Sequence, residues 1–328
     1  MYREEEYRRF REKACGNVTI YDGITKADSV LNSGKYTNGL VSVSGGSDSD
    51  CVVDIVTHLH YSNAQMQYIF IDSGMEYAAT KAHLTYLEYR YGISIERLRA
   101  VEPVPLAVKR RGYPFLSKHV SEMIGRLQEH HFRWEDAPFE VLLARYPECC
   151  SALKWWCNAH GKGSRYNIDR NKYLKEFLMA EHPPFRISAG CCEGAKKEAS
   201  HIYISSNRID LLIRGDRKAE GGARAKGMCL TQDGNFAVYR PLHWWKQADK
   251  TWYEKNFSVT HSCCYGKDGY GLRRTGCVGC PMSLNWQKEL EAAYLYEPKM
   301  HKLCMAVFGN VYEYLSRYDM FRRYSVHR

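Results

Sequence analysis

A serine- and glycine-rich turn is the first segment of this chain whose residue types could do chemistry. It reads Ser44-Gly45-Gly46-Ser47-Asp48-Ser49. Paired glycines let the backbone approach an anion, serine hydroxyls add donors, and amides at a helix start point toward negative charge. Asp48 would repel a bare phosphate, so its presence predicts a bridging Mg²⁺. The turn is predicted to bind phosphate groups; an ordinary turn with Asp48 or Ser49 as helix N-cap is the alternative.

Cysteines form the second such group, and the chain has 13 of them. Cys191-Cys192 and the later Cys277-Val278-Gly279-Cys280 supply four thiolates, enough for a [4Fe–4S] cluster or a tetrahedral Zn²⁺. Adjacent cysteines strain a single tetrahedral ion but suit a cluster whose irons lie apart. A second set, Cys149, Cys150 and Cys157, could replace the first pair, and reduced buried thiols without metal are a further alternative.

The elements around these residues predict an α/β fold. Strand-like runs at 40–43, 68–71, 93–98 and 209–213 alternate with helical spacing at 51–59 and 76–91. Such alternation is typical of right-handed βαβ units, and therefore of a parallel sheet with helices on both faces. The turn at 44–49 then lies at the carboxyl edge of the sheet, where α/β proteins bind ligands.

Composition changes suggest three consecutive parts. Residues 1–37 are predicted to be a peripheral N-terminal helical arm, residues 38–226 a nucleotide-binding domain with helices over 103–185, and residues 227–328 a Cys- and Trp-rich C-terminal subdomain that covers the mouth of the sheet. Hydrophobic packing is expected for both Trp155-Trp156 and Trp244-Trp245, with stacking on a base as the alternative.

The overall composition favours a cytoplasmic globular protein. Of the 328 residues, 45% are apolar and 26% charged, which is ordinary for folded domains. The first residues are charged and no run approaches the roughly 20 apolar residues that span a bilayer, so we expect no membrane association and reduced thiols. A net charge of +10 with 25 tyrosines suits an anionic partner such as nucleotide, tRNA or DNA, or a merely solvated basic face.

Three blocks in order along the chain resemble the PAPS (phosphoadenosine phosphosulfate) reductase family of the PP-loop, or N-type ATP pyrophosphatase, superfamily. The turn at 44–49 resembles the S-G-G-x-D-S signature. Asp72-Ser73-Gly74 resembles the family's D-T-G block with Ser in place of Thr, and Gly215-Asp216-Arg217 through Glu220 to Arg224 resembles its G-x-R-x-x-E-x-x-x-R block.

This resemblance implies an adenine nucleotide alpha hydrolase-like fold and a set of site residues. Ser44, Gly45, Gly46, Ser47, Asp48 and Ser49 would bind the phosphates, and Asp72 and Gly74 the adenosine end. Asp48, Arg217, Glu220 and Arg224 would be catalytic, with the two arginines gripping phosphate or sulfate. The Cys-Cys pair followed by C-x-x-C resembles the cluster ligands of APS (adenosine phosphosulfate) reductases, which implies Cys191, Cys192, Cys277 and Cys280.

Two enzymes follow from the resemblance. One cleaves ATP to AMP and pyrophosphate, adenylylates an acceptor such as tRNA or DNA, and lets sulfur from a donor protein such as a cysteine desulfurase displace AMP. The other reduces APS or PAPS. The absence of the reductases' E-C-G-x-H motif favours the first. A nucleotide- or DNA-binding regulator with a structural metal is the alternative outside enzymes.

Overall fold

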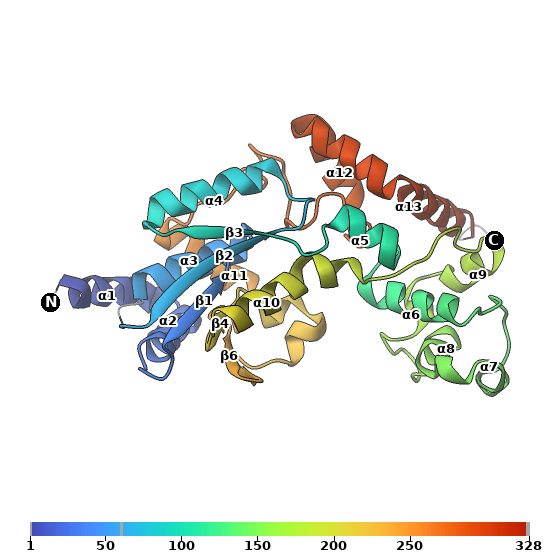
Figure 1. Cartoon of the computed structure of the whole chain (residues 1–328), viewed down its shortest axis with the longest axis horizontal. Helices are drawn as coiled ribbons and strands as arrows, with labels where there is room; N and C mark the ends of the chain where they lie inside the picture. The colour runs from blue at the N-terminus through green and yellow to red at the C-terminus, as the bar shows by residue number, and fades with distance from the viewer. Residues whose placement is uncertain (1, 60–61, 326–328) are drawn as a thin grey trace. The chain divides into compact units, whose positions relative to one another are not determined.

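The chain forms two compact units, each assembled from several segments. The structure is a computed structural model that describes residues 2–59 and 62–325 (Figure 1). The sheet unit comprises Met1–Asp72, Glu76–Ala100 and Glu198–Gly276; the helical unit comprises Ser73–Met75, Val101–Lys197 and Cys277–Arg328. The three consecutive parts suggested by composition are a different division and stay a prediction.

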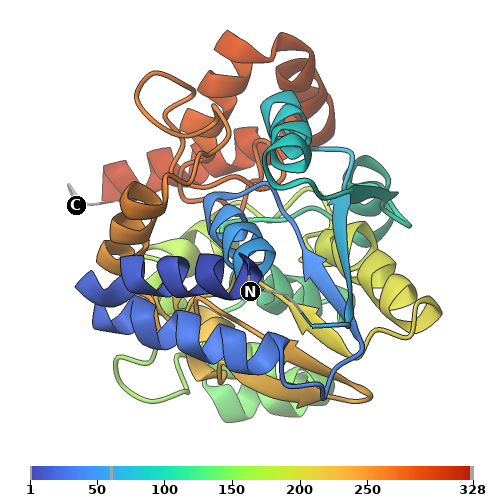
Figure 2. The ribbon, with the colours of Figure 1, turned by 90° about the vertical axis from the view of Figure 1, so that its left-hand side faces the viewer.

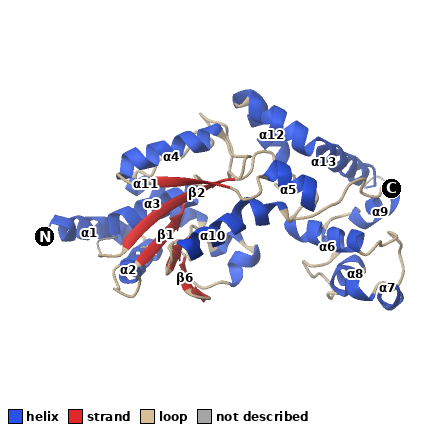
Figure 3. Cartoon of the chain, viewed as in Figure 1, coloured by secondary structure: helices blue, strands red, loops and turns tan. Residues whose placement is uncertain are grey.

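A six-stranded sheet organises the sheet unit, with the order β3-β2-β1-β4-β6-β5. All neighbouring pairs are parallel except β5 with β6. Figure 3 shows these strands in red. Their bounds are β1 Asn38–Ser42, β2 Gln65–Asp72, β3 Ile95–Arg99, β4 Leu211–Ile213, β5 Leu230–Asp233 and β6 Phe236–Tyr239.

Both faces of the sheet are buried, because successive side chains of a strand point to opposite sides. Val41 of β1 packs on one face, together with buried residues of α1 (Tyr2–Lys13), α2 (Val18–Leu31) and α3 (Ser47–Leu59). Its neighbour Leu40 packs on the other face, with Ile204 of α10 (Glu198–Ser206). The predicted parallel α/β sheet with helices on both faces is therefore confirmed.

Two strands were missed from the sequence. Residues after 227 were expected to cover the mouth of the sheet, but β5 and β6 extend the sheet itself, with β6 parallel to β4. Each strand is only four residues long and lies in a stretch rich in Gly and Trp, so no clear alternation marks it.

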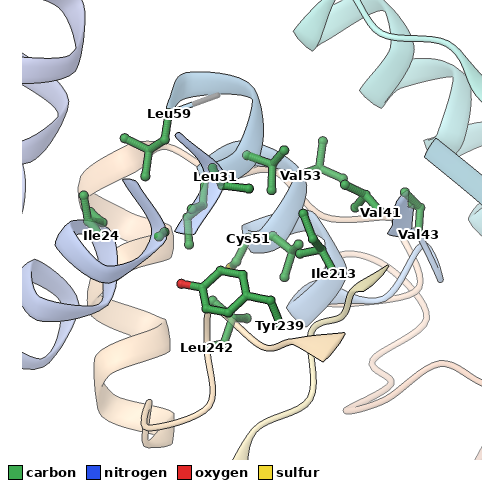
Figure 4. Close-up of a cluster of buried hydrophobic side chains, with 14 of the residues drawn as sticks. Ile24, Leu31, Val41, Val43, Cys51, Val53, Leu59, Ile213, Tyr239 and Leu242 are labelled. Carbon is green, nitrogen blue, oxygen red and sulfur yellow. The ribbon is translucent and has the colours of Figure 1, made fainter. Parts of the chain in front are cut away.

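The N-terminal helices are part of the core and not peripheral. Figure 2 shows α1 and α2 in dark blue, running side by side. Ile20 and Ile24 of α2 are fully buried, and Figure 4 shows Ile24 and Leu31 in one apolar cluster with Val53 of α3. The remaining helices of this unit are η1 (Ala14–Gly16), α4 (Ala78–Tyr91), η5 (Lys218–Glu220), η6 (Gly222–Lys226) and α11 (Gln247–Phe257).

Helices build the second unit, as expected for residues 103–185. Trp155 and Trp156 are completely buried there, which confirms hydrophobic packing for this pair. None of the helices in residues 2–59 and 62–325 is long and apolar enough to cross a membrane. The helices of the helical unit are α5 (Val104–Arg111), α6 (Lys118–Glu129), α7 (Phe139–Arg145), η2 (Pro147–Cys149), α8 (Cys150–Trp156), η3 (Ile168–Arg170), α9 (Leu174–Ala180), the π-helix η4 (Glu193–Lys197), α12 (Trp286–Tyr296) and α13 (Pro298–Ser325).

Candidate functional site

The turn at 44–49 joins the carboxyl end of β1 to the start of α3, as predicted. Its hydroxyls hold its own backbone: the Gly46 amide donates to Ser44 Oγ at 3.3 Å, and Ser49 Oγ donates to the Gly46 carbonyl at 2.8 Å. The Ser47 amide donates to the hydroxyl of Tyr265 at 3.2 Å. The turn is thus pre-shaped around the N-terminus of a 13-residue helix, where amides and the helix dipole favour an anion.

Gly45 is required by the shape of this turn. Its φ is +65°, and a Cβ at this position would lie 2.5 Å from Thr80 Cγ2, closer than real side chains approach. A side chain here would therefore push the turn away from α4.

Gly45→Ala should accordingly weaken nucleotide binding by more than tenfold, because the turn must shift and the conformation costs about 1 kcal/mol by itself. The matched control is Gly234→Ala, whose φ of +56° carries the same backbone penalty but whose surroundings are open within 4 Å. Equal affinities of the two variants for ATP, measured by calorimetry, would contradict this role of Gly45.

Two nearly buried cations converge on Asp48, at the start of α3. Arg217 Nε lies 2.8 Å from Asp48 Oδ1, an ion pair without the alignment of a hydrogen bond. Lys250 Nζ lies 3.7 Å from the same oxygen and donates to Ser47 Oγ at 2.7 Å. Burial raises the pKa of the Asp48 carboxyl, although the charges of Lys250 and Arg217 oppose the shift. Asp48 thus brings a lysine and an arginine to the turn at 44–49.

Carboxylates and histidines extend this network behind Lys250. The ammonium lies 2.7 Å from Glu254 Oε1, and that oxygen lies 2.9 Å from His261 Nε2. The other ring nitrogen of His261 lies 2.8 Å from Asp50 Oδ2, which also lies 3.2 Å from His83 Nε2. Burial lowers the pKa of Lys250, but the carboxylates of Asp48 and Glu254 outweigh it and the net pKa is raised. Lys250 is therefore held protonated.

His261 links pH to stability. Burial lowers its pKa, but hydrogen bonds and the charges of Asp50 and Glu254 prevail and raise it to about 9. Its stabilising contribution is complete below the unfolded pKa of about 6.5 and is lost as pH rises through 9. The free energy of unfolding should fall by about 2 kcal/mol between pH 7 and 10 through this group. Denaturant titrations at several pH values give the free energy of unfolding of wild type and His261→Gln. The variant should lose less stability between pH 7 and 10 than the wild type. Equal losses in the two proteins would contradict this role of His261.

Arg224 and Glu220 lie in a second charged group of the same unit. Arg224 Nη1 lies 2.7 Å from Glu220 Oε2, and Arg224 Nε lies 3.0 Å from Asp216 Oδ1. Glu220 Oε1 also accepts a hydrogen bond from the Arg217 amide at 3.1 Å, and this bond caps the start of η5. Arg217 therefore reaches the turn at 44–49 directly, whereas Glu220 and Arg224 shape the loop that carries Arg217.

The two residues predicted for the adenosine end fall in different units. Asp72 ends β2 in the sheet unit, where its Oδ2 accepts from Lys81 Nζ at 2.6 Å. Gly74 belongs to the helical unit, and its φ of +81° is a conformation that suits glycine. Their binding role stays a prediction.

The four predicted cysteine ligands all belong to the helical unit. The hydrogen bond from Cys191 to Cys192 and burial raise the pKa of Cys191, and the charges of Cys277 and Cys280 add to the shift. Burial raises the pKa of Cys280 to about 12. The four thiols therefore lie within electrostatic range of one another. Among the described residues, no three His, Cys, Asp or Glu side chains are arranged to ligate one metal ion.

The alternative doublet lies in other surroundings. Cys149 Sγ donates to the Arg126 carbonyl at 3.8 Å, and burial and the charges of Glu148 and Glu129 raise its pKa. Cys157 Sγ donates to the Ala137 carbonyl at 3.8 Å. The pKa shifts of these two thiols therefore come from burial and nearby side chains other than the Cys277–Cys280 pair.

Close packing fixes the backbone between Cys277 and Cys280. Gly279 has φ +63°, and a Cβ there would lie 2.5 Å from the Tyr312 hydroxyl and 3.2 Å from Cys304 Sγ. The Val278 amide donates to the Met75 carbonyl at 2.7 Å, and Cys304 Sγ donates to the Val278 carbonyl at 3.4 Å. Cys304 is fully buried. The C-x-x-C segment is held in one shape.

Sequence reasoning missed Lys250, Glu254, His261 and Asp50 of the charge network. Lys250 and Glu254 are one helical turn apart on α11, and Asp50 is one of two buried carboxylates, with Asp54, on α3. A fully buried carboxylate demands a partner, so Asp50 was the available signal. Nothing in the spacing pointed from Asp50 to His261, 211 positions later.

Comparisons with known proteins give structural similarity only. No protein-family model matches the chain, and no curated protein matches its sequence. Among solved structures, it is similar to a phosphoadenylyl-sulfate (PAPS) reductase from Candida auris, with 12% identity, TM-score 0.39, and coverage of 72% of this chain and 81% of that one. It is also similar to the U34-tRNA thiolase NcsA from Methanococcus maripaludis with its [4Fe-4S] cluster, with 13% identity, TM-score 0.40, and coverage of 94% and 81%.

At these identities and TM-scores, neither likeness assigns a ligand, reaction or partner to this chain. The first neighbour is a PAPS reductase, the kind of protein that the sequence blocks resemble.

Proposed function

We propose that this protein is an enzyme that binds an adenine nucleotide with its phosphates at residues 44–49 and cleaves ATP to AMP and pyrophosphate. The observation that carries the proposal is the convergence of Lys250 and Arg217 on the start of α3, beside hydroxyls of the turn. Both cations are nearly buried, so each interacts with a bound anion more strongly than a surface charge does.

In the proposed reaction an acceptor oxygen attacks the α-phosphorus of ATP. The new O–P bond forms as the bond to the bridging oxygen breaks, and pyrophosphate leaves with the electron pair. Charge develops on the departing pyrophosphate, where Lys250, the amides after Gly45 and the hydroxyls of Ser44 and Ser47 would stabilise it. A sulfur nucleophile then displaces AMP from the adenylylated acceptor.

Two bound groups belong to this proposal. Mg²⁺ held by Asp48 would screen phosphate charge. In this structure the Asp48 carboxylate forms ion pairs with Lys250 and Arg217. Cys191, Cys192, Cys277 and Cys280 would hold a [4Fe–4S] cluster, with Zn²⁺ as the alternative. A bound cluster would supply redox-active iron beside these cysteines. The hydrogen bond from Cys191 lowers the pKa of Cys192 to about 6, and a thiolate available near neutral pH fits metal binding because the ligands of a metal are deprotonated.

Reduction of APS or PAPS is the second candidate, favoured by the Cys-Cys and C-x-x-C pattern. The 328 residues contain no Glu-Cys-Gly-x-His sequence, and the buried thiol of Cys304, with its pKa raised to about 12 by burial, is a poor nucleophile.

Product analysis separates the two. Protein purified without oxygen is given ATP, APS or PAPS with Mg²⁺, a thiol and candidate acceptors, and pyrophosphate, AMP and sulfite are measured. Pyrophosphate from ATP supports adenylyl chemistry. Sulfite from a sulfonucleotide, with ATP left intact, would overturn it in favour of the reductase.

A further inference from the structure

Trp244 departs from the packing expected of a Trp-Trp pair. Trp245 is 1% exposed and packs on Tyr253, whereas its neighbour Trp244 is 53% exposed. Tryptophan is enriched at binding interfaces, because the large ring buries much apolar area and its N–H can donate a hydrogen bond. The two tryptophans of the pair therefore serve different purposes.

The exposed indole carries a cation over its face. Lys218 Nζ lies 4.8 Å from the centroid of the Trp244 ring. The Lys218 amide donates to the His243 carbonyl at 2.8 Å, which fixes the loop of Lys218 to the residue before Trp244. Since Lys218 directly follows Arg217, the exposed ring contacts the loop whose Arg217 reaches the turn at 44–49 through Asp48.

Around the loop that carries Lys218, arginines outnumber the carboxylates that they contact. Asp216 lies within 4 Å of the guanidinium groups of Arg214, Arg224 and Arg240, at 2.8, 3.0 and 3.7 Å. Glu220 is shared by Arg224 and Arg274, at 2.7 and 3.4 Å. Four guanidinium groups thus share two carboxylates. Burial and the charge of Arg214 lower the pKa of Arg240, as expected where cations crowd.

The loop leaves room for a polyanion. Gly221 and Gly222 have positive φ and open space around them. The side chains of Arg214, Arg224 and Arg274 are 45%, 40% and 71% exposed, so they can reach a ligand in solvent. Excess guanidinium charge suits phosphates, and an exposed indole suits an unpaired base.

We propose that Trp244, Lys218 and these four arginines form a binding surface for single-stranded nucleic acid, with a base stacked on Trp244 and neighbouring phosphates on the arginines. The position of Arg217 at the phosphate turn would bring a strand bound here toward the reacting nucleotide; this last step rests on the proposed function. A mononucleotide is the competing occupant, because its single base could stack on the same ring.

Fluorescence anisotropy with labelled 20-mers of dT and U tests the surface, in parallel with calorimetry of ATP. Trp244→Ala should weaken oligonucleotide binding about 5- to 100-fold, the range for loss of one base–aromatic stack, and leave ATP affinity unchanged. Trp244→Phe should restore most of the binding. Tyr89→Ala, a control at an aromatic residue that is 91% exposed on α4, should have no effect. Arg274→Gln should reduce the slope of log affinity against log salt by about 0.7.

Three results would overturn the inference: no oligonucleotide binding by the wild type at low salt, equal binding by Trp244→Ala, or a loss of ATP affinity in Trp244→Ala with oligonucleotide binding intact. Failure of the proposed function looks different, because the wild type would then bind oligonucleotide on this surface without binding ATP.

Discussion

Lys250→Met should lower turnover by about 10²- to 10³-fold and weaken ATP binding, the largest effect expected of any residue in the sheet unit. Lys250 is 5% exposed and reaches Ser47 Oγ at 2.7 Å, so its charge acts on the phosphate turn with little screening. Pyrophosphate release and ATP calorimetry measure the two effects.

The same change also affects folding, which must be measured separately. Removing one member of a buried charge group leaves Asp48 and Glu254 less compensated and costs about 3 to 5 kcal/mol in other proteins. Lys255→Met is the matched control, because Lys255 is an exposed lysine on the same helix. If folded Lys250→Met retained wild-type affinity and turnover, Lys250 would have no part in the site.

Cys277→Ser and Cys280→Ser should each abolish or strongly deplete the metal centre, the largest effect expected in the helical unit. A thiolate ligand cannot be replaced by an alcohol, because the pKa of the alcohol is far higher and it stays protonated. Iron, sulfide and zinc analysis after anaerobic purification measures the loss, together with absorption near roughly 400 nm.

Two further variants make this test specific. Cys263→Ser, at an exposed cysteine of the sheet unit, should leave metal content unchanged. Cys150→Ser should do the same if Cys191 and Cys192 are the partners of the C-x-x-C. Stoichiometric zinc without iron in the wild type would show that the site holds zinc and not a cluster. Absence of both metals would contradict the proposal of a metal site.

Local patterns predicted the parallel sheet because each βα unit carries its own signal. The strand at 40–43, the glycine turn and the apolar helix after it are contiguous, and the structure places them as β1, turn and α3. Strand β6 has no such unit, since it follows β5 in a short hairpin and pairs with β4. In the N-terminal helices, Ile20 and Ile24 stand one helical turn apart, a sign of a buried face that the prediction of a peripheral arm did not use.

Sequence blocks likewise identified some charged residues of the site and missed others. Asp48 and Arg217 stood in recognisable blocks, and the structure brings them to 2.8 Å. Lys250 and His261 lie in no block, and only the fold brings them to Ser47 and Asp50. The two residues of a long-range ion pair have no fixed separation in the sequence. A buried Asp50 could therefore indicate that a partner exists, but not which residue it is.

The central claim is that residues 44–49 bind the phosphates of a nucleotide. Calorimetry tests it most directly, by comparing Mg·ATP binding to the wild type and to the Ser44→Ala/Ser47→Ala double variant. Loss of two hydroxyls from charged phosphate groups should weaken binding by about 1 to 3 kcal/mol in total. Ser206→Ala, at an exposed serine on α10, should not change it. Tight wild-type binding that is unchanged in the double variant would contradict the claim.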